Sequence, residues 1–402
     1  MATEWFDLAL DLVRGTSGFS PPVASRAFGY AGVTLYEALV PGMPGYRSLA
    51  RKLNDLGAAP GPSDPAHHWP TVANAAIASI LRSLFPTMTS ENKGAVDALE
   101  ESFAQGFRTT VPPGIYRRSV ARGRSVAGHI FEWSKADGGH EGYLHNFPAY
   151  TLPVGPGLWV PTPPGFLPAL QPFWGSNRPF TLASGSQCDP GSPLPYSEEP
   201  SSAFYAETIE CYEVVANLSP EQRAIALFWS DDPGLTVGPP GHSVSILTQV
   251  LRGGGFSLDV AAEAYARLGI AVADAFIACW NTKYRYNLLR PVTYIQRQID
   301  PAWSPPLVTP PFPEYTSGHS VQSAASAQVL TDLFGDVAFT DHTHDDRGLA
   351  PRSFNSFFEA AEEAAVSRLY GGIHFRTAIA LGLEQGRCIG HHVSNLEFRA
   401  GS

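Results

Sequence analysis

Residues 257–291 read SLDVAAEAYARLGIAVADAFIACWNTKYRYNLLRP, and this stretch decides the fold. Ser257 suits the N-cap of a helix, and Asp259 suits its first turn. Apolar residues then recur at steps of three and four, which predicts one buried stripe: Leu268, Val272, Phe276 and Cys279. The next step reaches Lys283. The pattern therefore predicts a long helix that carries a lysine on its buried face and ends by Pro291.

A second predicted helix, residues 355–370, ends in the same way. Its small apolar stripe leads to an arginine, and the members in order are Phe357, Ala361, Ala364, Ala365 and Arg368. A buried arginine is costly unless a group of opposite charge lies beside it. Two such cations on separate helices therefore suggest that both face one anion.

A Pro-rich, irregular stretch is expected from Pro291 to Pro313, and Ser317-Gly318-His319 then opens a predicted helix that runs to Phe334. Free N–H groups and the helix dipole favour an anion at such a start. Gly318 lets the backbone come close to a ligand, and Ser317 can cap the helix or donate to that ligand. The imidazole of His319 can move protons near neutral pH.

His374 follows Gly371-Gly372, which ends the helix of Arg368, and it heads the next predicted helix. Together the segments supply three cations, although the chain carries a formal net charge of -10. Such a cluster must be held against its own repulsion. We therefore expect one tetrahedral oxyanion, such as phosphate or sulfate, in contact with Lys283, Arg290 and Arg368.

The ordered set Lys-x6-Arg-Pro, Ser-Gly-His and Ser-Arg-x5-His resembles the signature of vanadium-dependent haloperoxidases and the acid phosphatases related to them. Flanking segments look like the soluble bacterial haloperoxidase branch: residues 228–234, 239–242, 351–354 and 370–376, with a similar early segment from Ala24 to Ala38. The resemblance covers nearly the whole chain. It implies an all-α protein of helical bundles, with the active site in a C-terminal four-helix-bundle half.

The resemblance also assigns roles to residues of this sequence. Non-bridging vanadate oxygens would be bound by Lys283, Arg290, Ser317, Gly318 and Arg368. His374 would be the single covalent ligand of the metal, and His319 the acid/base. Lys283 would also polarise bound peroxide. Trp280 and Phe312 lie where chloroperoxidase-type members keep aromatic residues, so they are candidates for a halide pocket, although both can equally be plain core.

Two positions depart from the pattern of the relatives. Many of them, the phosphatases above all, carry aspartate four residues after the ligand histidine, and this chain has Ala378 there. Because a ligand histidine needs an acceptor for its other ring nitrogen, we expect a backbone carbonyl to serve. Thr316 stands where a proline commonly precedes Ser-Gly-His, which decides little by itself.

Composition fits a globular, soluble protein, with 44% hydrophobic and 16% charged residues among 402. No apolar run is long enough for a membrane span, and a pI of about 5.6 without a broad basic stripe argues against nucleic acid. No signal peptide is recognisable, so a cytoplasmic location and export with a trimmed signal both stay open. Four scattered cysteines do not fix the compartment, although Cys279 is expected to be a buried thiol.

Helical patterns dominate the chain, and no convincing set of alternating strands appears. We expect a single haloperoxidase-like domain made of a helical half (1–145), an irregular middle segment (146–202) and a second helical half (203–402) that carries the anion site. The middle segment is rich in Pro and Gly but also holds aromatic residues. We expect it to wrap over the bundle and border the site entrance.

Other readings of individual motifs stay open. The loop 341–346, Asp-His-Thr-His-Asp-Asp, is usually the kind of loop that water solvates, but it can also supply ligands to a divalent metal. Asp231 and Asp232 are either solvated or hold an arginine of the anion site.

The predicted function is oxidation of bromide, and of chloride to some degree, by hydrogen peroxide, with a small organic acceptor for the product. The alternative is a soluble acid phosphatase that forms a phosphohistidine at His374. A third reading is an oxyanion-binding protein without turnover. The sequence leaves the oligomeric state open, a homo-oligomer included.

Overall fold

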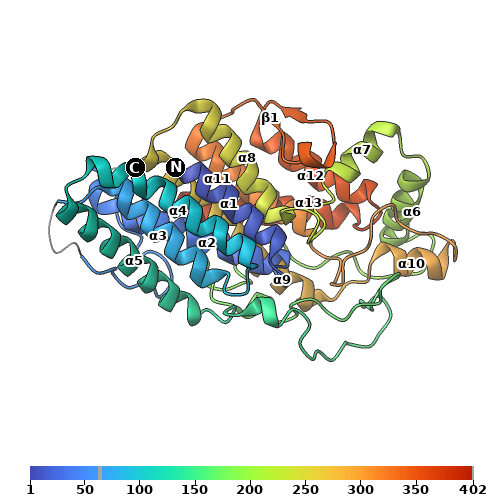
Figure 1. Ribbon diagram of the computed structural model, residues 1–402. Coiled ribbons are helices and arrows are strands. Elements are labelled where there is room, and N and C mark those ends of the chain that lie inside the picture. The colour runs from blue at the N-terminus through green and yellow to red at the C-terminus, as the bar shows by residue number, and fades with distance from the viewer. Residues whose placement is uncertain (62–65, 401–402) are drawn as a thin grey trace.

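The computed structural model describes residues 1–61 and 66–400, and it is mainly helical, as predicted (Figure 1). The first five helices are α1 (Ala2–Gly15), α2 (Pro21–Leu39), α3 (Trp69–Leu84), α4 (Ser90–Thr110) and α5 (Pro113–Lys135). The next five are α6 (Ala203–Ala216), α7 (Pro220–Phe228), α8 (Gly238–Gly254), α9 (Leu258–Tyr286) and α10 (Pro291–Gln298). The last three are α11 (Gly318–Phe334), α12 (Phe357–Tyr370) and α13 (Arg376–Ser394).

Minor elements complete the chain. Two three-residue strands, β1 (Phe339–Asp341) and β2 (Arg352–Phe354), pair antiparallel. The 3-10 turns are η1 (Val40–Gly42), η2 (Gly142–Leu144), η3 (Trp174–Ser176) and η4 (Asp345–Arg347). Among the described residues, none of the helices combines the length and the hydropathy that a membrane crossing requires.

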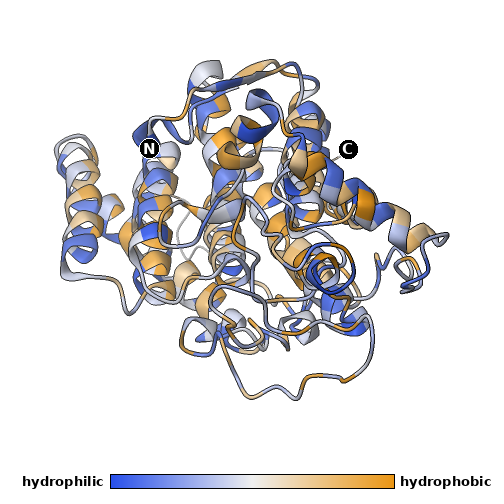
Figure 2. Ribbon diagram, turned by 90° about the vertical axis from the view of Figure 1, so that its right-hand side faces the viewer, coloured by the Kyte–Doolittle hydropathy of each residue, from blue (hydrophilic) through white to orange (hydrophobic). Residues whose placement is uncertain are grey.

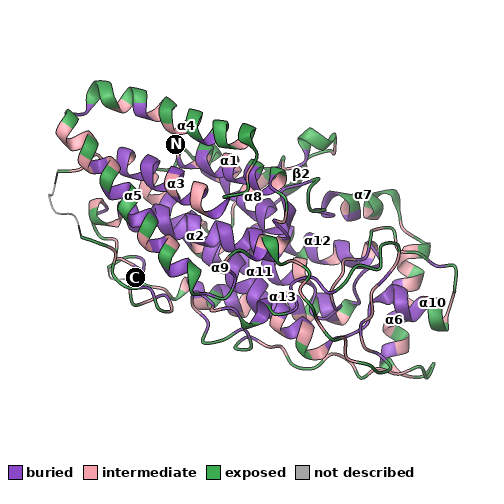
Figure 3. Cartoon of the chain, turned by 60° about the horizontal axis from the view of Figure 1, so that its bottom comes forward, coloured by how far each residue is buried: buried purple, intermediate pink, exposed green. Residues whose placement is uncertain are grey.

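Helix α9 lies at the centre of the molecule, packed against α2 and α11 (Figure 3). The predicted stripe Leu268, Val272, Phe276 and Cys279 is buried, and so is Lys283. Small residues bring α2 and α9 close together: a Cβ on Gly32 would lie 2.4 Å from the Tyr265 carbonyl oxygen. Helix α4, by contrast, is largely exposed (Figure 3). The outer helices carry both hydrophobic and hydrophilic faces (Figure 2).

The core has two clusters. The larger one spans α1, α2, α3, α8, α9 and α11. The smaller one gathers residues that follow α9 together with parts of α6, α12 and α13, and its members include Leu289, Tyr294, Tyr315, Leu369 and Phe375. The anion-site residues named by the sequence lie on the segments where these two clusters meet.

The prediction of an irregular stretch from Pro291 to Pro313 was wrong in part, because its first eight residues form α10. Proline at the first helical position needs no N–H partner and has a suitable φ, so Pro291 starts this helix instead of preventing one. The pair β1 and β2 was also missed, since three-residue strands are too short to show alternation.

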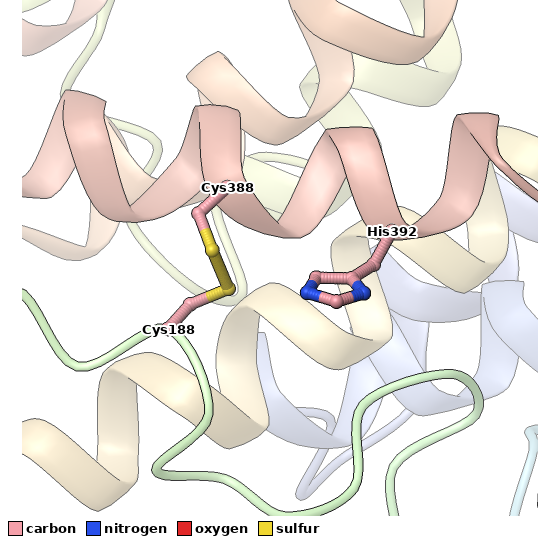
Figure 4. Close-up of side chains that lie close together, drawn as sticks. All are labelled: Cys188, Cys388 and His392. Carbon is pink, nitrogen blue, oxygen red and sulfur yellow. A yellow bond between two sulfur atoms is a disulfide. The ribbon is translucent and has the colours of Figure 1, made fainter.

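Residues 146–202, all described, contain no α-helix, yet they are tied to the bundle at several points. The buried carboxylate of Asp274 accepts hydrogen bonds from the N–H groups of Phe180 and Thr181 at 2.6 and 2.8 Å. The Trp159 N–H donates to the Asn287 carbonyl oxygen at 2.7 Å. A disulfide, which the sequence had not indicated, joins Cys188 of this segment to Cys388 of α13 (Figure 4).

Candidate active site

The predicted site residues come from the ends of four helices. Lys283 lies in the last turn of α9, and Arg290 is the N-cap of α10. Ser317 caps α11, where its hydroxyl accepts the Ser320 N–H at 3.3 Å, and Gly318 and His319 begin that helix. Arg368 lies in the last turn of α12, and His374 lies between α12 and α13. The starts of α10 and α11 leave backbone N–H groups available to a ligand, whereas Lys283 and Arg368 reach the site from the last turns of their helices.

His374 is held through both ring nitrogens. Its Nδ1 lies 2.8 Å from Glu314 Oε1, which also accepts the Phe375 N–H at 2.9 Å. Its Nε2 lies 3.1 Å from Arg290 Nη1. The expected backbone carbonyl partner was therefore wrong. A carboxyl group sixty residues earlier in the chain pairs with Nδ1. Nε2 is therefore the nitrogen left to bind a ligand, in exchange for its present contact with Arg290 Nη1.

The cationic side chains converge on His374. Burial first, and then the charges of Arg290, Lys283 and Arg368, hold the pKa of His374 well below its ordinary value. Burial lowers the pKa of Arg290 and of Arg368 to about 10. It raises the pKa of Glu314 to about 8 in spite of its cationic neighbours. A neutral His374 beside several cations is suited to coordinate an electron-poor centre and to attract an anion.

Lys283 differs from the expectation in one respect. Its Nζ donates to three backbone carbonyl oxygens, those of Pro313, Glu314 and Thr316, at 2.9, 2.9 and 2.6 Å. An ammonium group has three donors, so all of them are used here. Burial lowers the pKa of Lys283 to about 7. The lysine thus supports the turn before Ser317, and its approach to an anion would require one of these bonds to be exchanged.

Donors without partners mark the place of a ligand. Arg290 Nη2 and His319 Nε2 are two of several buried side-chain atoms of the described residues that make no hydrogen bond of good geometry, although Asp231 Oδ2 lies 3.4 Å from His319 Nε2. Native proteins rarely leave such atoms unsatisfied unless a water, an ion or a ligand takes the place. An oxyanion between Arg290, His319 and His374 would satisfy both atoms, so the residues present fit the predicted group.

Asp231 is buried, so the solvated reading was wrong for it, and its charge acts on Arg368, although its closest side-chain contacts are imidazoles. No hydrogen bond joins it to an arginine of the site. Instead its buried carboxylate lies 3.0 Å from His242 Nδ1, 3.2 Å from His344 Nε2 and 3.4 Å from His319 Nε2. His242 Nε2 lies 2.7 Å from Asp341 Oδ2. A buried row of alternating carboxylates and imidazoles therefore stands behind His319.

His242 and His319 differ in protonation state. Although burial opposes it, Asp231 and Asp341 raise the pKa of His242 to about 10, so this imidazole is protonated at neutral pH. Burial first, and then Arg368, lower the pKa of His319 to about 4. His319 is therefore neutral at neutral pH until an anion binds beside it. A neutral imidazole can accept a proton, which suits an acid/base role.

The loop 341–346 is not one self-contained metal site. Asp341 and His344 are buried and face His242 and Asp231, whereas the exposed His342 pairs with Asp345 at 2.9 Å. The expectation of a solvated loop was wrong for its two buried members. Their partners come from α8 and from the loop before it, which the local sequence does not reveal.

A cavity of about 320 Å³ opens onto the anion site. Gly318, His319, Arg368 and His374 line it, together with both halide-pocket candidates, Trp280 and Phe312. The two aromatic rings contact each other with centroids 4.9 Å apart. Residues 162–167 of the middle segment also line the cavity, so this segment does border the site.

Sequence reasoning missed Glu314 and the role of Asp231 and His242. Glu314 gave no signal, because it is a single acidic residue in a Pro-rich stretch. Asp231 and His242 lie in the segments 228–234 and 239–242, which resemble haloperoxidase flanks. The presence of both segments in one chain was the sequence signal that could have linked Asp231 with His242.

Comparison with known proteins identifies similar chains. The family described as the VCPO second helical-bundle domain matches residues 263–400. The structure of a bacterial vanadium-dependent iodoperoxidase is 39% identical, covers 99% of this chain and 97% of its own, and has a TM-score of 0.91.

Two structures of a bacterial vanadium-dependent chloroperoxidase, holo and apo, share the fold at 17% identity. The holo form covers 95% of this chain and 93% of its own, with a TM-score of 0.72. The apo form covers 94% of each, with a TM-score of 0.71. Curated protein sequences gave no match. Given its 39% identity to the iodoperoxidase over almost the full length of both chains, this chain belongs to the bacterial vanadium-dependent haloperoxidase family.

Proposed function

We propose that this protein oxidises iodide and bromide with hydrogen peroxide, using vanadate bound at His374. The observation that carries the proposal is the environment of His374 Nε2. Glu314 holds the opposite ring nitrogen at 2.8 Å, and three buried cations act on the ring. Such a nitrogen is prepared for a metal in an oxyanion, and family membership supports vanadium as that metal.

The residues would share the work as follows. His374 Nε2 would bind the metal, while Arg290, Arg368, Lys283 and the start of α11 with Ser317 and Gly318 would neutralise the oxygens. Vanadate supplies Lewis-acid activation of peroxide without a change of oxidation state. His319 would accept or return protons on the open side of the site. In the net reaction the halide gives two electrons to peroxide, the O–O bond breaks, one proton is taken up, and hypohalous acid and water form.

Chloride is the least favoured of the three halides in this proposal. Its oxidation is the hardest and needs the strongest polarisation of peroxide in a dry site. Trp280 and Phe312 supply a dry wall, but Lys283 already donates to three carbonyls and has a pKa of about 7. The similar iodoperoxidase supports iodide. Oxidation of bromide is the activity that distinguishes this proposal from an enzyme that oxidises iodide alone.

The first test measures iodide, bromide and chloride oxidation with and without added orthovanadate, and aryl phosphate hydrolysis as the control for the phosphatase alternative. We expect halide oxidation that depends on vanadate. His374→Ala should abolish tight vanadate retention, because it removes the ligand. His319→Ala should lower turnover by roughly 10²–10⁴-fold, the usual worth of a general acid/base, yet keep anion binding. Equal vanadate affinity of wild type and His374→Ala would refute the ligand assignment.

A second test concerns Phe312. Its ring packs on Trp280, and the Arg290 guanidinium carbon and Lys283 Nζ lie 4.9 and 5.0 Å from its centroid. Phe312→His would bring polarity and water to this wall. Any chloride turnover should therefore fall more than bromide turnover in steady-state kinetics. A chloride-to-bromide ratio that does not change would remove Phe312 from the halide pocket while leaving the vanadate site intact.

A further inference from the structure

The cavity above the anion site is polar at its floor and apolar along its walls. The floor is formed by His319, Arg368 and His374. The walls are formed mainly by segments 162–167 and 307–312 together with Trp280, and residues 230–233, with the carboxylates of Asp231 and Asp232, line one side. Peroxide and halide need only the floor. A cavity of about 320 Å³ lies in the size range in which proteins hold small organic molecules. The walls therefore need an explanation of their own.

Hydrogen bonds within the protein hold these walls in place. The Leu170 N–H donates to the Pro311 carbonyl oxygen at 2.9 Å, which joins the middle segment to segment 307–312. The Leu170 carbonyl oxygen accepts from Trp280 Nε1 at 3.2 Å and from the Tyr284 hydroxyl at 2.7 Å. Three segments, the middle segment, segment 307–312 and α9, thus meet at Leu170. A cavity fixed in this way is a formed site and not a loose surface patch.

The rim of the cavity exposes large apolar side chains. Phe166 is 61% exposed, Leu167 49% and Val308 67%. Phe166 also has a φ of 45°, which a non-glycine residue rarely adopts without a reason. Exposed apolar residues that gather at the mouth of a cavity mark a ligand contact more often than chance exposure does. A hydrated halide ion gains nothing from such a rim.

We infer that this cavity binds the organic acceptor, and that the acceptor is a neutral, largely apolar molecule of one or two rings. The inference rests on the proposed function, because the oxidant must form at the floor. An electron-rich ring carbon then attacks the halogen of hypohalous acid. The carbon–halogen bond forms, the halogen–oxygen bond breaks, and the ring proton leaves with hydroxide as water. The protein itself would thus select which acceptor is halogenated.

The test is a competition between two neutral phenols of different polarity, thymol and 4-hydroxyphenyl glucoside. The ratio of their halogenated products is measured with the enzyme, peroxide and bromide, and separately with free hypobromous acid. This ratio does not depend on how fast the oxidant forms. We expect the enzyme to shift it at least tenfold toward thymol. A ratio equal to that of the free reagent overturns the inference, because the oxidant then reacts after it has left the protein.

Substitutions on the rim test whether the rim causes the preference for thymol. Leu167→Asp and Val308→Asp place a charge on exposed positions, so the fold tolerates them, and each should return the ratio toward that of free hypobromous acid. Val154→Asp is the matched control: Val154 is 98% exposed on the same middle segment but does not line the cavity. It should keep the wild-type ratio. Selectivity that survives both rim substitutions contradicts the inference.

A binding measurement separates this inference from the proposed function. Calorimetric titration with thymol needs neither peroxide nor turnover, and we expect wild type to bind thymol at least tenfold more tightly than Leu167→Asp does. If bromide and iodide are not oxidised but thymol binds in this manner, the proposed function fails and the acceptor site stands. If halide is oxidised and thymol does not bind, the acceptor site fails alone.

Discussion

Glu314 sets the chemical state of His374, and it does so from a position that no helix period predicts. Its Oε1 lies 2.8 Å from His374 Nδ1 and also accepts the Phe375 N–H. Its Oε2 has no partner among the described residues. Ala378 leaves no carboxylate at the position four residues after His374. Glu314 thus takes over the task that an aspartate at that position would perform.

This role makes a prediction for Glu314→Gln. The side chain keeps its size but loses the carboxyl group that pairs with Nδ1, so the tautomer of His374 is no longer fixed. We expect the dissociation constant of vanadate to rise by roughly 10–100-fold, as is usual when the partner of a ligand histidine is lost. Recovery of halide oxidation by the apoprotein during orthovanadate titration measures it. Glu199→Gln makes the same change on an exposed side chain and should leave the constant unchanged. An equal constant for Glu314→Gln and wild type would contradict the assignment.

Asp231 and His242 show a second case in which residues from distant segments orient a histidine of the site. The pKa of His242 is raised to about 10 because carboxylates lie on both sides, and Asp231 in turn lies 3.4 Å from His319. Removing one member of a buried charged row leaves its neighbours without partners, which is costly. The row therefore orients His319 as one unit, and its residues are expected to tolerate substitution poorly.

At the scale of elements, the packing of α13 on α11 determines where the start of α11 lies. Three glycines spaced by four residues line this contact: Gly382, Gly386 and Gly390. A Cβ on Gly386 would lie 2.2 Å from the Val321 carbonyl oxygen, and a Cβ on Gly382 would lie 2.8 Å from Ser320 Cβ. The two helices approach this closely only because side chains are absent there.

We predict that Gly386→Ala destabilises the protein by about 1–3 kcal/mol, because the backbones of α11 and α13 must separate. The displacement also moves Ser317-Gly318-His319, so vanadate affinity should fall as well. Gly94→Ala is the matched control in exposed α4, where a Cβ meets nothing within 4 Å. It should stabilise by about 0.5–1 kcal/mol, since alanine favours a helix. Chemical denaturation measures both, and an unchanged stability for Gly386→Ala would refute the close contact.

At the scale of the whole molecule, the disulfide joins parts of the chain 200 residues apart (Figure 4). Cys188 lies on the middle segment whose residues 162–167 line the cavity, and Cys388 lies on α13, which supports α11. The bond thus ties the middle segment to α13. Loops of this length gain on the order of 5 kcal/mol from closure in the chain-entropy account.

Thiol titration checks this arrangement. Cys211 and Cys279 are buried and free, so the native protein should show no fast-reacting thiol. After denaturation two thiols should react without reductant, and all four cysteines of the chain with it. Reduction of the native protein should lower its melting temperature. Four reactive thiols in the denatured, unreduced protein would exclude the disulfide, and the double variant Cys188→Ser, Cys388→Ser serves as the two-thiol reference.

The sequence alone determined the helices and the set of charged side chains that they bring together. Both follow from local periodicity: a step of three or four residues placed Lys283 and Arg368 on buried faces, and Ser317-Gly318-His319 at a helix start. Helix α10 was not predicted, because Pro291 was taken to end helical structure, whereas proline can also begin a helix. Local sequence patterns therefore predict single helices and the residues at their ends, but not the contacts between helices.

Only the tertiary structure decided which partners these residues have. Glu314 reaches His374, Asp231 reaches His319, and Cys188 reaches Cys388, each across long separations and from irregular segments. No period relates such positions, because their meeting depends on how whole helices pack. The same packing turned the three donors of Lys283 to carbonyl oxygens and placed segment 162–167 over the site. The chemistry of the floor follows from the sequence, whereas the walls that select a substrate follow from the fold.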